Sequence, residues 1–149
     1  MKKTIFALLL TLSNSLCFSQ IQRNFLGCNL GVTTKSEAVL KFTQKKFNVM
    51  EGKNDVEIVG KILFDNVQYN SAIFVFRNNK FKSVTFFKSH ITNKSIRYNL
   101  VGKYKKYLQN KADDEYLDFS DGRTIINLEC DDPTEGLILT YSDKELSEK

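Results

Sequence analysis

The chain has 149 residues, of which 42% are hydrophobic and 26% charged, with one proline and seven glycines. This composition is typical of a folded domain and excludes a disordered or low-complexity protein. The formal net charge of +5 is unevenly distributed: residues 20–112 hold 17 Lys and Arg against 5 Asp and Glu, and residues 113–149 hold 3 against 12. The basic region 20–112 suggests an anionic surface as a partner, although pairing of acidic with basic strands explains the same pattern more simply. With no recognised binding motif, nucleic acid is not expected as a partner.

The N-terminus has the pattern of a secretory signal peptide. Two lysines precede an apolar run, Ile5 to Leu12, which a polar stretch follows. A small-x-small site ending at Ser19 predicts residues 1–19 as the signal peptide and residues 20–149 as a single domain. Lipid anchoring at Cys17 is the less favoured alternative. Because a membrane-spanning helix needs about 20 apolar residues, we expect a secreted or periplasmic protein without a transmembrane span.

The predicted elements alternate between helical spacing of apolar residues and runs rich in Val, Ile, Phe and Tyr. We expect helices at 35–48 and 94–110, and strands at 56–64, 67–76, 81–88, 115–119, 123–129 and 136–141. Asn78-Asn79 and Asp121-Gly122 mark hairpin turns, the second of type I′, and Gly60 predicts a bulge.

This order predicts an α+β fold built from two helix–three-strand units. The helices are expected to pack on one face of an antiparallel sheet, and the two units, 33–90 and 92–142, suggest an internal structural repeat. The first helix should bury Val39, Leu40, Phe42 and Phe47. The second should bury a comparable apolar face made of Ile96, Leu100, Val101, Tyr104, Tyr107 and Leu108.

The loop GCNLGVTTKSEAVLKF, residues 27–42, superficially resembles a phosphate-binding loop. That motif requires a glycine before Lys-Ser, and Thr34 stands there instead. Thr34 followed three residues later by Glu37 is the pattern of a capping box at the start of a helix. We therefore expect a capped helix and no nucleotide site.

A weak resemblance to a known family lies in the same segment. Residues Gly31 to Val39 are similar to the G-x-(S/T)-x-x-x-V start of the first helix in the SmpA/OmlA outer-membrane assembly lipoproteins. The order of elements also resembles the related β-lactamase-inhibitor-protein-like (BLIP-like) fold, in which a helix-and-sheet unit is duplicated. The resemblance implies a binding module of the bacterial-type cell envelope and transfers no site residues.

The remaining cysteines, Cys28 and Cys130, predict a disulfide in an exported protein, with two separate buried thiols as the alternative. Two cysteines and the single His90 make a metal site improbable, and no cofactor is expected. The acidic run at 113–122 does not fit a calcium-binding loop, because Leu117 and Phe119 stand where oxygen ligands are needed.

The predicted function is a non-enzymatic protein-binding module. Phe86 and Phe87 are adjacent in a strand, so they point to opposite faces, and at least one can lie outside the helix-covered core. Together with Lys82 they form the candidate surface for an unknown envelope or secreted partner. Two alternatives stay open: a small secreted hydrolase or carbohydrate-active protein with dispersed carboxylates, and a structural envelope protein that acts through its basic surface.

Overall fold

The computed structural model describes residues 20–89, 94–110, 116–130 and 136–148. The predicted signal peptide, Cys17 and His90 lie outside these residues. The elements run in chain order as β1 (Asn24–Phe25), β2 (Cys28–Asn29), α2 (Lys35–Gln44), β3 (Asn48–Glu51), β4 (Asp55–Phe64), β5 (Val67–Arg77), β6 (Lys80–Lys88), α3 (Lys94–Tyr104), the 3₁₀ helix η2 (Lys105–Tyr107), β7 (Leu108–Asn110), β8 (Tyr116–Ser120), β9 (Thr124–Cys130), β10 (Leu137–Asp143) and α4 (Lys144–Ser147).

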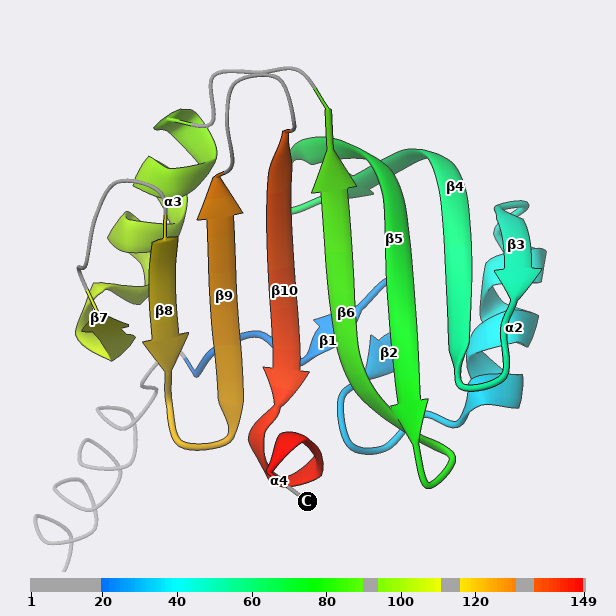
Figure 1. Cartoon of the computed structure of the whole chain (residues 1–149). Coiled ribbons are helices and arrows are strands. Elements are labelled where there is room, and N and C mark those ends of the chain that lie inside the picture. The colour runs from blue at the N-terminus through cyan, green and yellow to red at the C-terminus, as the bar shows by residue number, and fades with distance from the viewer. Residues whose placement is uncertain (1–19, 90–93, 111–115, 131–135, 149) are drawn as a thin grey trace, which may run out of the picture.

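Eight of these strands form one antiparallel sheet. Its strand order is β3-β4-β5-β6-β10-β9-β8-β7, and β1 pairs with β2 in a separate small hairpin. Strands β3 to β6 form one meander and β7 to β10 another, and the two meet where β6 pairs with β10 (Figure 1). The last strand of the chain therefore lies inside the sheet, between β6 and β9.

The predicted α+β fold class is wrong, because the protein is mostly β. Strands hold 52% of the described residues and helices 24%. Four strands follow each of the predicted helical segments where three were expected. The additional strands, β3 and β7, are short edge strands whose conformation comes from pairing with β4 and β8. The second helix was expected to reach residue 110 but ends at Tyr104, where the chain turns through η2 into β7.

The predicted Asn78-Asn79 hairpin and Gly60 bulge are confirmed, whereas the predicted type of the Asp121-Gly122 turn is wrong. Asn78 and Asn79 have φ of 51° and 56°, as a tight hairpin requires, and Gly60 has φ of 129° at a break in the β4–β5 register. Asp65-Asn66, which the sequence reading did not single out, makes a second hairpin with positive φ at both residues. The Asp121-Gly122 turn joins β8 to β9 but is not of type I′, because only the glycine has a positive φ. In its place the Asp121 carboxylate accepts hydrogen bonds from two following backbone N–H groups.

The core lies on the face of the sheet toward α2, α3 and the β1–β2 hairpin, which Figure 1 shows behind the strands. Phe25 of the hairpin is fully buried, with its ring 4.7 Å from Tyr141 and 5.4 Å from Phe64. From α2, Phe42 packs on Phe74 with ring centroids 4.6 Å apart. Leu40 was expected in this core but is 59% exposed, and Ala38 and Phe42 are the residues of α2 that are buried.

Candidate functional site

The opposite face of the eight-stranded sheet is covered by none of the described elements (Figure 1). On this side, half-buried residues alternate with fully buried ones that point into the core, as along β10. Cross-strand pairing arranges them in three rows, which together we call the open face. The rows are Val59, Ser71, Phe87, Ile138, Glu129 and Tyr116; Glu57, Ile73, Thr85, Thr140, Asn127 and Asp118; and Asp55, Val75, Ser83, Ser142, Ile125 and Ser120.

The middle of the open face is apolar or carries hydroxyl groups. At the junction of the two meanders, the Oγ1 atoms of Thr85 and Thr140 lie 3.0 Å apart in a hydrogen bond. In the next row Phe87 lies opposite Ile138, and Ile73 lies opposite Thr85. Backbone pairing fixes the positions from which these side chains project, so the backbone of this surface is already ordered before binding.

The structure separates the three residues of the predicted partner surface. Phe87 lies half-buried on the open face, where the sequence reading put one of the two phenylalanines. Phe86 is fully buried and stacks on Phe64 at 4.5 Å, so it belongs to the core and not to a surface. Lys82 is half-buried and precedes Ser83 on β6, at an irregularity in the β5–β6 register just outside the third row.

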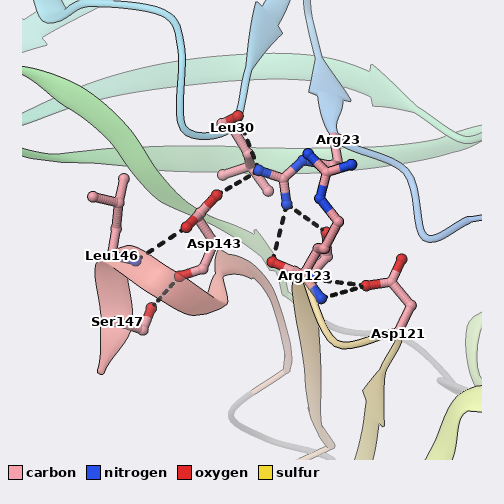
Figure 2. A network of polar contacts seen from close by, with 8 residues as sticks. Arg23, Leu30, Asp121, Arg123, Asp143, Leu146 and Ser147 are labelled. Carbon is pink, nitrogen blue, oxygen red and sulfur yellow. Dashed lines mark hydrogen bonds and ion pairs between the residues drawn. The ribbon is translucent and has the colours of Figure 1, made fainter. Parts of the chain in front are cut away.

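A buried polar network ties the N-terminal segment to the end of β10 (Figure 2). The Arg23 guanidinium forms an ion pair with the Asp143 carboxylate and donates to the Leu30 carbonyl at 3.1 Å. It also donates to the Thr124 Oγ1 atom at 2.8 Å. A side chain at Gly31 would place its Cβ 2.8 Å from the Asp143 carboxylate, so this glycine leaves room for the network. These contacts join the segment before β1 to the start of β9 and the end of β10.

The predicted capping box is confirmed. Thr34 Oγ1 accepts a hydrogen bond from the Glu37 N–H at 3.3 Å, and the Glu37 carboxylate accepts one from the Thr34 N–H at 2.8 Å. This second hydrogen bond is the main reason that the pKa of Glu37 is lowered. Lys41 and Lys45 of the same helix region donate to the Gly27 and Leu26 carbonyls, so part of the basic charge serves the fold.

A small cavity lies under α3. It has about 10 Å³ of space, enough for one water molecule, and is lined by Phe64, Asp65, Val67, Tyr69, Ile96, Asn99, Leu100, Leu139 and Tyr141. Burial raises the pKa of both Tyr69 and Tyr141 above the ordinary range. The cavity's one carboxylate, Asp65, pairs with Lys103 at 3.1 Å. A glycosidase site needs two carboxyl groups that converge on a substrate, so this cavity does not favour the hydrolase alternative.

Cys28 carries a free, buried thiol, and the side chain of Cys130 lies outside what the structure describes, so a disulfide between the two stays a prediction. The thiol lies in the β1–β2 hairpin among core residues, and burial raises its pKa to about 11. It therefore resembles a small hydrophobic side chain, which is the alternative that the sequence left open.

Several candidate ligand residues lie outside the residues that the structure describes. His90 and the first three residues of the acidic run at 113–122 are among them. Within residues 20–89, 94–110, 116–130 and 136–148, no three His, Cys, Asp or Glu side chains gather as metal ligands would. No helix in those ranges has the length and apolar character that crossing a membrane requires.

Most residues of the open face could not be predicted from the sequence. Alternation along a single strand identifies Phe87, but its neighbours Ser71 and Ile138 come from strands 16 and 51 positions away in the chain. The pairing of β6 with β10 brings them together, and no local pattern encodes that pairing. The segment 136–141 reads GLILTY, with three consecutive apolar residues, so its own pattern does not show which face of the sheet Ile138 takes.

Comparison with known proteins adds no relative: no protein-family model, no curated protein and no solved structure matches the chain. The resemblance to the SmpA/OmlA and BLIP-like proteins therefore stays a prediction.

Proposed function

We propose that the protein is an exported, non-enzymatic binding module that holds a protein partner of the cell envelope against its open face. The observation that carries the proposal is that an eight-stranded sheet has one face covered and the other free of any described element. The export part rests on the N-terminal pattern of lysines, an apolar run and a small-x-small site.

The chemistry of the open face supports a protein partner. Specific interfaces have an apolar centre surrounded by a polar rim. Phe87, Ile138 and Ile73 lie in the middle strands, and polar or charged residues such as Glu57 and Asp118 lie in the outer ones. A small ligand would need a concave pocket of roughly 300 Å³ or more, much larger than the water-sized cavity under α3.

Site-specific photocrosslinking tests the binding face. A photoreactive phenylalanine analogue replaces Phe87 in one variant and Tyr98 in another. Each variant is expressed in the cells that normally make the protein, so that the envelope partner is present. Tyr98 is the matched control because it is aromatic, 82% exposed and located on α3, away from the open face. We expect a discrete crosslinked species from position 87 only, lost when Ile138→Asp is added. Crosslinks from position 98 alone, or from neither position, would refute the proposal.

Export is tested separately. The intact chain has a mass of 17.2 kDa, and removal of residues 1–19 is expected to give a shorter protein that begins at Gln20. Fractionation followed by N-terminal sequencing measures both the compartment and the cleavage site. An uncleaved chain in the cytoplasm would remove the export part of the proposal, while a start at Cys17 would support lipid anchoring.

A further inference from the structure

The charges on the open face are all of one sign. Its three rows contain the carboxylates Glu57, Asp118, Glu129 and Asp55, and none of their eighteen residues is Lys or Arg. Glu129 on β9 lies in the row of Phe87. Glu57 on β4 and Asp118 on β8 lie in the row of Thr85. They flank the apolar and hydroxyl-bearing middle on both sides.

These carboxylates have no cationic partner within the described part of the chain. Asp118 accepts a hydrogen bond from the Asn127 amide at 2.6 Å, and Glu129 accepts one from the Tyr116 hydroxyl at 3.2 Å. Both are neutral donors. The Glu57 carboxylate forms neither a hydrogen bond nor an ion pair with any residue that the structure describes. The negative charge of the face is thus uncompensated.

This acidic face runs against the charge of the chain as a whole, which is +5. The helices α2, α3 and η2 contain seven Lys and Arg and a single Glu. The three rows therefore keep their carboxylates separate from the cations, five of which lie on β4, β5 and β6 outside the rows: Lys61, Arg77, Lys80, Lys82 and Lys88. Separated charge of this kind steers an oppositely charged partner and fixes its orientation.

We propose that the occupant of the open face is a cationic protein segment, with Lys or Arg on both sides of an apolar contact. The proposal rests on the proposed function and names the chemistry of the partner. Glu57 and Asp118 lie in one row five strand spacings apart, which corresponds to about 24 Å. The partner's cations would pair with them across that distance, while its apolar residues contact Ile73, Phe87 and Ile138.

Titration of the isotopically labelled protein with deca-lysine, followed by amide chemical shifts, tests this directly. The test variant is Glu57→Gln/Asp118→Asn/Glu129→Gln. The control is Glu51→Gln/Glu145→Gln/Glu148→Gln, which removes the same charge from residues outside the rows. We expect deca-lysine to shift amides of β4, β8 and β9 in the wild type and the control, and to bind the test variant about tenfold more weakly. Deca-glutamate should leave these amides unchanged.

Equal affinity of deca-lysine for the two variants, or shifts confined to the helices, would overturn the proposal. Circular dichroism of each variant ensures that a loss of binding is not a loss of folding. Self-association that perturbs the same amides would also overturn it, because the occupant would then be a second copy of the chain.

The variant with the photoreactive residue at position 87 distinguishes a failure of this inference from a failure of the proposed function. If position 87 captures a partner equally well with and without the three acid substitutions, the face binds a protein but not through cations, and only this inference fails. If position 87 captures nothing, the proposed function fails and this inference fails with it.

Discussion

Two neighbouring phenylalanines in β6 show how much one step along a strand changes. Phe86 is fully buried and stacks on Phe64, whereas Phe87 lies on the open face opposite Ser71 and Ile138. Sequence alternation predicts that the two point in opposite directions, but it does not say which of them faces the core. The pairing with β5 and β10 settles that.

Alanine at each position tests this assignment. Phe86→Ala removes a ring from the core and should lower the free energy of unfolding by about 4 kcal/mol. Phe87→Ala should lower it by about 1 kcal/mol, because the ring is only half-buried. Urea unfolding followed by circular dichroism measures both values. Similar losses for the two variants would contradict the assignment of faces.

The buried thiol of Cys28 makes a second prediction at this scale. Its pKa is about 11 in the folded chain against an ordinary value of 9.0, so the folded state holds the proton more tightly. The stability that the neutral thiol contributes is therefore complete below pH 9.0 and is lost as the pH rises through about 11. We expect the stability difference between wild type and Cys28→Ala to be constant near neutral pH and to shift against the wild type over that window.

Urea unfolding of both chains at each pH gives that difference. Tyr69 and Tyr141 also have raised pKa values, but they are present in both chains and cancel. A difference that does not change up to pH 11 would mean that the thiol ionises equally easily in the two states.

At the scale of elements, strands are predicted correctly from the sequence where composition and turn signals coincide. Strands β4, β5 and β6 are rich in β-branched and aromatic residues and are separated by tight turns, so their predicted limits differ from the observed ones by one residue. β3 and β7 have four and three residues, too few to show a period, and their partners β4 and β8 impose their conformation. Tyr107 and Leu108 continue the helical spacing of apolar residues, and both do pack on the core. They do so from the 3₁₀ helix η2 and from strand β7, not from a continued α-helix.

A pair of glycines tests the bulge in β4. A Cβ at Gly60 or at Gly102 would meet no atom within 4 Å, so neither substitution creates a clash. Gly60 has φ of 129°, however, and Gly60→Ala should cost about 1–3 kcal/mol in backbone strain. Gly102 lies within α3, and Gly102→Ala should stabilise the protein by about 0.5–1 kcal/mol. Thermal unfolding measures the two opposite shifts, and a stabilising Gly60→Ala would argue against the bulge.

At the scale of the whole molecule, a single ion pair links the two ends of the described chain. Arg23 and Asp143 are 120 positions apart, and their side chains are only 20% and 10% exposed. The pair joins the segment before β1 to the end of β10 (Figure 2).

Arg23→Met tests the importance of this link. Removal of the cation leaves the Asp143 carboxylate buried and unpaired, which should cost about 3–5 kcal/mol. Lys144→Met is the control, since it breaks the exposed Lys144–Glu148 pair at 3.7 Å and should cost less than about 0.5 kcal/mol. Urea unfolding compares the two, and a loss as small as the control's would show that the buried pair contributes little.

The place of β10 inside the sheet has a consequence for when the protein folds. Strand β10 pairs with β6, but it begins at Leu137, 49 positions after β6 ends at Lys88, so it is made after α3, η2, β7, β8 and β9. Until β10 arrives, the first meander ends in an unpaired edge and the second lacks its inner strand. The eight-stranded sheet therefore cannot be completed before β10 has been made, and pairings so distant in sequence slow folding.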